Sequence, residues 1–147
     1  MRYMTLLILL GPLLLPVAAQ AYESESVNKL LDKDKCGQCN LAGAMLSGKD
    51  LSAAKLAGAN LFAADMENAN LAKADLDDTN LMGANLQGAN LSGADLHGAK
   101  LSGAILTRAN LTGANLRQAS LDEVILQGAR FCHTVMSDGT TRNSGCP

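Results

Sequence analysis

The stretch GANLQGANLSGADL, residues 83–96, has a leucine at every fifth position, with Ala two residues before it and Asn or Asp one residue before it. The spacing continues in both directions without a gap. Large apolar residues occupy all twenty positions from 41 to 136 at steps of five, and seventeen of them are Leu. Two residues earlier, fifteen of the twenty are Ala; two residues later, ten are Gly. The chain is a tandem array of five-residue units.

Neither regular secondary structure accommodates a period of five. Five residues of α-helix turn the side-chain direction by about 140°, so the leucines would surround the cylinder instead of forming one apolar stripe. Along a straight strand, side chains alternate between faces, so an odd period would send successive leucines to opposite sides. A corner in every unit removes the difficulty, because each short side then directs its leucine inward. Gly and Ser suit such corners, and Ala suits the second, narrower inward position.

The unit A-(N/D)-L-x-G, as in Ala84-Asn85-Leu86-Gln87-Gly88, resembles the pentapeptide-repeat family over residues 39–138. The resemblance implies an all-β solenoid, a right-handed quadrilateral β-helix with four units in each coil. Twenty units would make about five coils. Because neighbouring strands lie about 4.8 Å apart, such a rod would be about 20–25 Å long.

The first residues have the pattern of a secretory signal peptide. Arg2 precedes an apolar run over residues 5–18, and Ala19-Gln20-Ala21 supplies a small-x-small cleavage site, so residues 1–21 are interpreted as the signal. Proline interrupts the run, which is also short for a spanning helix, so no transmembrane anchor is expected after cleavage. The alternative is an uncleaved anchor. We predict a secreted or periplasmic protein, or one of the thylakoid lumen if the source is photosynthetic.

Both ends of a stacked coil expose unpaired strand edges, so we expect both to be covered. Val27, Leu30 and Leu31 have the i, i+3, i+4 spacing of a short amphipathic helix, predicted over residues 24–34. Residues 22–38 are therefore interpreted as an N-terminal helical cap that packs over the first coil.

The C-terminal end has its own signals. Asp138-Gly139 favours a tight turn, after which residues 139–147 would form a capping hairpin or tail folded back on the last coil. A Cys132–Cys146 disulfide would hold this tail in place, since export exposes the chain to an oxidising compartment. The segment FCHTVMSDGTTRNSGC also resembles the closing segment of many pentapeptide-repeat proteins.

Cys36-Gly37-Gln38-Cys39 has three interpretations. A structural disulfide would join the N-terminal cap to the first coil, and we favour it. A thioredoxin-like redox pair would need the motif at a helix N-terminus in a βαβ unit, a context absent from this sequence. A zinc site would need further ligands, and the other two cysteines lie at the far end of the repeats.

A coil of twenty residues places residues twenty apart in columns along the rod. Several columns consist of asparagine, and we predict that their side chains form hydrogen-bonded ladders between coils. The columns are Asn40, Asn60 and Asn80, and Asn70, Asn90 and Asn110 with Asp50 below them.

Charge and apolar side chains at outward positions suggest an interaction surface. Residues 60–98 contain six acidic side chains and one basic one, a net charge of −5, whereas residues 99–147 contain five basic and three acidic ones, a net of +2. We interpret the acidic middle as a solvated face and keep open that it binds a cation or a basic partner. Adjacent apolar pairs on a flat β face are a second sign of an interface. The candidate residues are Phe62, Met82, Ile105, Ile125, Asp75, Asp77 and Asp78.

The sequence favours a protein without catalytic activity. The two histidines, His97 and His133, are expected to be isolated and outward-facing, and no catalytic, cofactor-binding or metal-binding residue is identified. No basic stripe with interleaved aromatics is present, so no nucleic-acid partner is expected.

We therefore predict a secreted structural or protein-interaction module with an unknown protein partner, and with a weak homodimer as a further expectation. The alternative is a thiol–disulfide redox protein that uses Cys36 and Cys39. A gyrase-binding DNA mimic, a role known in this family, is disfavoured by the signal peptide, the short rod and the basic C-terminal end.

Overall fold

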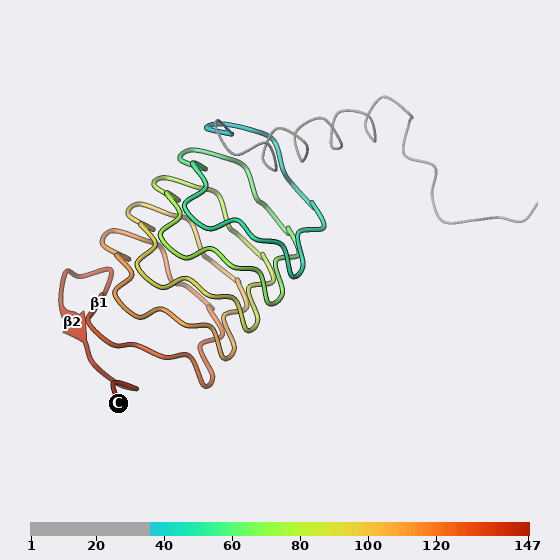
Figure 1. Cartoon of the computed structure of the whole chain (residues 1–147). Coiled ribbons are helices and arrows are strands. Elements are labelled where there is room, and N and C mark those ends of the chain that lie inside the picture. Colours follow the sequence, from blue (N-terminus) through green and yellow to red (C-terminus); the bar gives the residue numbers. More distant parts are fainter. Residues whose placement is uncertain (1–35) are drawn as a thin grey trace, which may run out of the picture.

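Stacked coils of nearly equal shape form the protein in the computed structural model, which describes residues 36–147 (Figure 1). Sixteen parallel bridges join the coils, and each pairs residues exactly twenty positions apart, from Asn40 with Asn60 to Asn115 with Val135. Four five-residue units therefore make one coil of a β-helix. Within residues 36–147 no helix is long and apolar enough to cross a membrane. The predicted signal peptide and the predicted helix over residues 24–34 lie outside the described residues.

Each unit consists of a short side followed by a corner. In the unit around Leu81, the Ala84 N–H donates to the Leu81 carbonyl at 3.1 Å across a four-residue turn, and the third residue of this turn, Gly83, has φ +66°. A positive φ at that position is what a type II turn requires. After the corner, Asn85 forms the bridges to the neighbouring coils. The corner that a period of five demands is thus a repeated type II turn.

The inward side chains form one continuous core. Leucines such as Leu86, Leu91 and Leu96 are fully buried, as are the alanines two positions before them. Each buried leucine contributes about 1.5–3 kcal/mol relative to an exposed one. Thr79 and Thr134 replace Ala at inward positions, and both hydroxyls have acceptors in the preceding coil: Thr79 Oγ1 donates to the Leu56 carbonyl at 3.0 Å, and Thr134 Oγ1 donates to the Leu111 carbonyl at 2.6 Å.

The asparagine ladders are present. Asn60 Nδ2 donates to Asn40 Oδ1 at 3.0 Å, and Asn80 repeats the bond to Asn60 at the same distance. The second predicted column is bonded in the same way, down to Asp50. The same oxygens also accept a backbone N–H two residues further on, as Asn60 Oδ1 does from Phe62 at 3.2 Å. Each Asn side chain therefore stabilises its own corner and also links its coil to a neighbouring coil.

Glycine positions depend on the side chain one coil earlier. Ten non-glycine residues also adopt the left-handed corner conformation, among them Asp78 with φ +52°. Its carboxylate lies over Gly98 in the next coil, so a Cβ on Gly98 would clash with Asp78 Oδ1. Asn68 lies over Gly88 in the same way, whereas a Cβ on Gly103 would meet nothing within 4 Å. The Asn68 and Asp78 side chains thus require a glycine at the same corner of the following coil, whereas the short Ala53 side chain is followed by Lys73.

The chain ends in a hairpin. Strand β1 (Thr134–Val135) pairs antiparallel with β2 (Thr141–Arg142), and the turn between them contains Gly139, whose N–H donates to the Met136 carbonyl at 2.9 Å. Asp138 Oδ1 accepts bonds from the Thr140 hydroxyl at 2.7 Å and from the Thr140 N–H at 2.9 Å. Both bonds favour the charged carboxylate and hold the pKa of Asp138 below its ordinary value, and the bond from the hydroxyl has the larger effect.

Gly98→Ala is expected to destabilise the protein more than Gly103→Ala. Both variants put a Cβ on a left-handed residue, which costs about 1–2 kcal/mol, but only the first also displaces the Asp78 carboxylate. Urea unfolding should therefore rank Gly98→Ala below Gly103→Ala in free energy of unfolding. Adding Asp78→Ala should bring Gly98→Ala to the level of Gly103→Ala; a difference that survives in the double variant would contradict the clash.

Thr140→Val is expected to raise the pKa of Asp138 towards its ordinary value, because the stronger of its two hydrogen bonds is lost. A carboxyl whose pKa is lowered by folding stabilises the folded state above its unfolded pKa, and that contribution disappears as pH falls through the folded pKa. The variant should therefore lose hairpin order at a higher pH during acid titration. Carbon-detected NMR titration of the Asp138 carboxyl measures the shift, and Thr141→Val, which leaves both bonds intact, should not change it.

Candidate functional site

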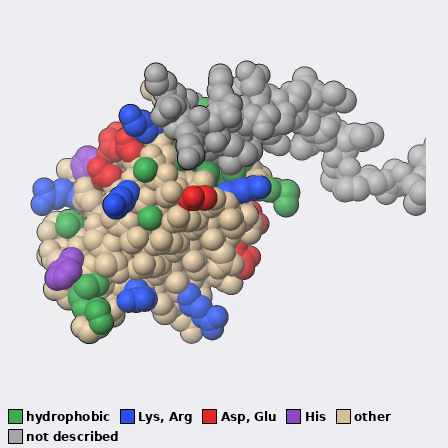
Figure 2. Space-filling model, viewed as in Figure 1, with side chains coloured by type: hydrophobic (Ala, Val, Ile, Leu, Met, Phe, Trp, Pro, Cys, Tyr) green, Lys and Arg blue, Asp and Glu red, His purple; other side chains and the backbone are tan. Residues whose placement is uncertain are grey.

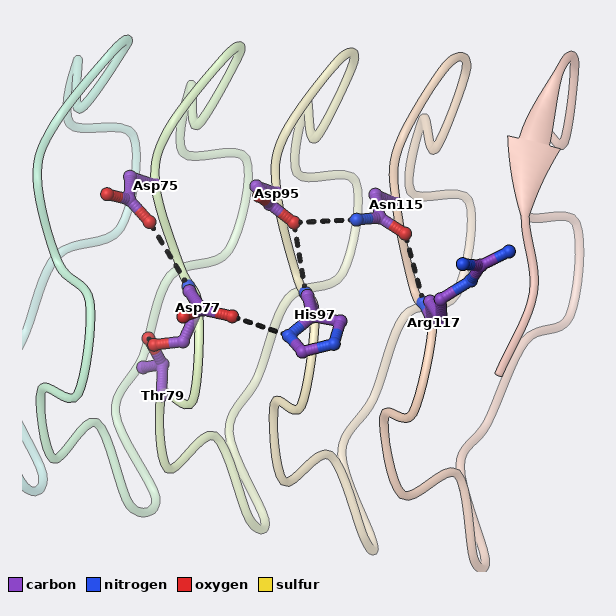
Figure 3. A network of polar contacts seen from close by, with 7 residues as sticks. All are labelled: Asp75, Asp77, Thr79, Asp95, His97, Asn115 and Arg117. Atoms are coloured by element: carbon purple, nitrogen blue, oxygen red, sulfur yellow. Dashed lines mark hydrogen bonds and ion pairs between the residues drawn. The ribbon is translucent and has the colours of Figure 1, made fainter. Parts of the chain in front are cut away.

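A polar network on one side of the rod contains most of the acidic residues singled out in the sequence (Figure 3). Asp75 and Asp95 are bridge partners in adjacent coils. Each carboxylate accepts the backbone N–H two residues ahead, Asp75 Oδ1 from Asp77 at 3.3 Å and Asp95 Oδ1 from His97 at 3.2 Å. Asp95 Oδ1 also accepts from Asn115 Nδ2 at 2.9 Å, so the network extends along three coils.

His97 is not the isolated side chain that the sequence indicated. Its Nδ1 lies 2.8 Å from Asp77 Oδ1, and the two residues occupy the same corner of adjacent coils. The side chains are 39% and 43% exposed, so the pair contributes at most about 1 kcal/mol to stability. Arg117 follows at the next position of this column (Figure 3). The corner therefore presents an acid, a histidine and an arginine in a row along the rod.

The three neighbouring acids do not converge on a common point. Asp75 Oδ1 accepts a backbone N–H, Asp77 Oδ1 contacts His97, and Asp78 Oδ1 lies over Gly98. These carboxylates form a negatively charged edge in which each is directed at a different neighbour.

The apolar candidates lie further round the rod. Phe62 and Met82 occupy the same corner of adjacent coils and are 49% and 38% exposed. Ile105 and Ile125 are bridge partners on the following side, where Ile125 is 47% exposed and Ile105 is half-buried. The side bearing Asn60 and Asn80 separates the Phe62 corner from the acidic corner.

Met45 is a further exposed apolar residue, with 81% of its surface accessible, that was not among the residues predicted for an interaction surface. It occupies the bridge position where this chain usually has Asn or Asp, and that departure from the pattern could have revealed it. Asp65 and Asn85 follow it in its column and separate it from Ile105.

The corner opposite the acidic one is hollowed. A depression of about 460 Å³ is lined by Gln87, Thr107, Arg108, Gln127 and Gly128. Arg108 has φ +58° and its side chain leans over Gly128, which shapes the wall of the depression. The sequence did not indicate this hollow, because it depends on the direction in which one corner side chain leans.

Both pairs of cysteines form disulfides. Cys36 is bonded to Cys39, and Cys36 is almost fully buried. Cys132 is bonded to Cys146, which ties the tail to the last coil. A ring nitrogen of His133 and the two sulfur atoms of this second bridge lie within 4.8 Å of one another. Because metals bind the free thiolate, the bonded sulfurs do not serve as ligands here.

Comparison with known proteins agrees with this geometry. The period of five, the corner in each unit and the twenty-residue coil define a β-helical solenoid built from short tandem repeats. The family model "Pentapeptide repeats" matches the chain in eight copies over residues 35–71, 64–103 and 99–138. The chain belongs to the pentapeptide-repeat family, and membership implies that the β-helix is right-handed.

Solved structures of the family resemble the chain. A pentapeptide repeat protein from the Arabidopsis thaliana thylakoid lumen is 35% identical, with 66% of this chain and 71% of that one covered and a TM-score of 0.53. One from Nostoc Pcc 7120 is 32% identical, with 73% of both chains covered and a TM-score of 0.51. Rfr23 from the cyanobacterium Cyanothece 51142 is 45% identical with a TM-score of 0.46, over 54% of this chain and 58% of its own length. No curated protein sequence matches the chain significantly.

Replacing Cys132 and Cys146 by Ser is expected to release the tail. A disulfide that closes a loop of this length lowers the entropy of the unfolded chain and so stabilises the folded state by about 3 kcal/mol. The Cys36–Cys39 disulfide joins residues only three positions apart, so its stabilisation is smaller. Hydrogen exchange should show faster exchange at the Phe131 and Met136 amides, whose acceptors belong to the tail. The matched Cys36→Ser/Cys39→Ser variant should leave those two amides protected; equal protection in both variants would show that the hairpin holds without its bridge.

Proposed function

We propose that this protein is a non-catalytic, exported module that presents a rigid charged surface to a protein partner. The observation that carries the proposal is the polar corner described above. Asp77, His97 and Arg117 stand in one straight column, with Asp75, Asp78 and Asp95 beside them. Because these positions repeat once per coil, the charged groups are spaced regularly along the rod.

Rigidity supports a binding role. The coils that carry the acidic corner are joined by backbone hydrogen bonds on every side and by side-chain ladders on three sides, so their outward groups are ordered before a partner arrives. A preorganised surface avoids the entropy cost of ordering loops and side chains upon binding. The net negative charge of residues 60–98 favours a partner with a basic segment. Complementary charge raises the association rate more than the affinity.

The surface extends from the acidic corner to the Phe62 corner. Going round the rod, the acids Asp77 and Asp78 come first, then the side bearing Asn60 and Asn80, then Phe62 and Met82. This order puts charged, amide and apolar groups on one continuous surface, a mixture typical of non-obligate protein interfaces. Ile105 and Ile125 lie one side further round and extend the apolar part.

The proposal includes an extracytoplasmic location and a finer architecture. Two disulfides and the signal pattern over residues 1–21 support export, and a relative occurs in the Arabidopsis thaliana thylakoid lumen. We infer about five coils over residues 39–138, closed by residues 22–38 as an N-terminal helical cap and by residues 139–147 as a C-terminal tail.

Two other functions are less well supported. A redox role for Cys36 and Cys39 favours a pair at the N-terminus of a helix, whereas these two residues flank a turn in which the Cys39 N–H donates to the Cys36 carbonyl at 3.1 Å. A gyrase-binding DNA mimic would need uniform acidity, whereas the corner that begins with Asp77 ends with Arg117.

Photo-crosslinking tests the proposed surface. We expect benzoylphenylalanine in place of Phe62 to capture a defined partner in cells of the source organism, while the same residue at Ser92, on the corner diagonally opposite Phe62, captures none. Asp78→Lys should abolish the crosslink from position 62, because it reverses the charge that attracts a basic segment. Lys73 already occupies an equivalent left-handed corner next to a glycine, so the fold accommodates this substitution. Equal capture from positions 62 and 92 would refute the assignment.

A further inference from the structure

The C-terminal end of the rod has two unequal halves. On one half, the tail replaces a further coil: the Phe131 N–H donates to the Ser144 carbonyl at 2.8 Å, and the Met136 N–H donates to the Thr140 carbonyl at 2.7 Å. In every earlier coil, such an N–H donates to the carbonyl nineteen residues ahead. The tail therefore forms half of an additional layer, and Phe131 beneath it is buried.

The other half of this end is open. The N–H groups of four residues there have no acceptor within residues 36–147, and the carbonyls of Ala119, Val124 and Ala129 have no donor there. The four donors are Leu121, Glu123, Leu126 and Gly128. An exposed strand edge of this kind is a template for pairing with another chain.

The core is exposed at the same place. Leu121 and Leu126 are only half-buried, as are Val124 and Ala129. The equivalent residues one coil earlier, such as Leu101 and Leu106, are at most 1% exposed. The apolar side chains that Figure 2 shows at this end of the rod lie on the other half, beside the C-terminus. Apolar surface and unpaired backbone groups thus coincide on the half that the tail leaves free.

The two halves are complementary in shape. The tail rises one layer above the open half, so the end of the rod is a step. A rotation of 180° about an axis along the edge of the step places the tail of one copy over the open half of a second copy. The same rotation places the tail of the second copy over the open half of the first. A contact of this isologous kind closes after two copies and leaves no further free step.

Charge is complementary across the same axis. Asp122 and Glu123 lie exposed at the corner of the open half, and neither carboxylate has a hydrogen bond or ion pair within residues 36–147. Arg142 lies exposed on the tail, with its guanidinium carbon 4.1 Å from the centre of the Phe131 ring. The half-turn that fits step to step brings each acidic corner towards the arginine of the other copy.

We propose that the C-terminal end of the rod is a homodimer interface, in which each tail covers the open coil of a second copy. A twenty-residue coil at about 3.3 Å per residue encloses a square of about 16 Å on a side. The cross-section is then about 260 Å², so even with its outward side chains each copy contributes well under the 800 Å² or so of a standard interface. The dimer is therefore weak, with a dissociation constant in the micromolar to millimolar range. This interface is separate from the charged corner and does not depend on the function proposed for it.

Sedimentation velocity of the purified protein from about 10 μM to about 1 mM, a range that spans such an affinity, tests the proposal. We expect a concentration-dependent monomer–dimer equilibrium, weakened about tenfold or more by Asp122→Lys/Glu123→Lys. Lysine is tolerated at this kind of corner, since Lys73 has nearly the same φ as Glu123. Adding Arg142→Glu should restore the dimer by exchanging charges across the interface, and Glu67→Lys, a single charge reversal in the middle of the rod, should leave the equilibrium unchanged.

Amide hydrogen exchange gives a second, independent measurement. The amides of Leu121, Glu123, Leu126 and Gly128 should exchange rapidly in dilute solution and become protected as the dimer forms. A protein that stays monomeric at 1 mM, on the order of the weakest expected affinity, overturns the proposal. A dimer that does not respond to the charge variants overturns it as well and places the contact elsewhere. Protection of the four amides in the monomer would also overturn it, because the open half would then be covered without a second copy.

Discussion

Hydrogen bonding across an interval of twenty residues is the constraint on which the structure depends. Each coil of the repeat region lies against the one before it, and the backbone bonds that join them leave no freedom in register. Residues twenty positions apart form a column, and each column therefore calls for its own type of residue. Inward columns hold Leu and Ala, bridge columns hold Asn that bonds to Asn, and corner columns have a glycine wherever the previous coil presents a side chain such as Asp78. Long-range order follows from repeating a local rule.

Much of the fold could be predicted because the period is odd and the pattern has no gap. These two facts require a corner in each unit, and a coil of twenty follows from the family resemblance, which also places the asparagine ladders. The pair of His97 and Asp77 could have been identified by counting twenty residues, yet each side chain was considered alone. The hollow beside Arg108 depends on the lean of a side chain, which no periodicity encodes. The half-exposure of Leu126 depends on how far the tail extends over the last coil.

Function on such a rod is confined to what the columns present outward. The core positions of this chain are nearly uniform, so its distinctive side chains lie at bridge and corner residues. Here one corner combines acids, a histidine and an arginine, the adjacent corner presents Phe62 and Met82, and the end presents an unfilled step. These surfaces lie on a scaffold whose coils hold one another in place, so their relative positions are set by the stacking itself.

The left-handed corners have a consequence for how such a chain changes in length during evolution. Gain or loss of one five-residue unit would preserve the inward leucines, the turns and the backbone bonds, so the packing of the core would be unchanged. Every residue beyond that point would nevertheless rotate by a quarter turn about the axis. The acids at Asp77 and Asp78 would then align with a different corner from Arg117, and the clearance of Gly98 beneath Asp78 would be lost. Only whole coils of four units can be exchanged without rearranging the surface.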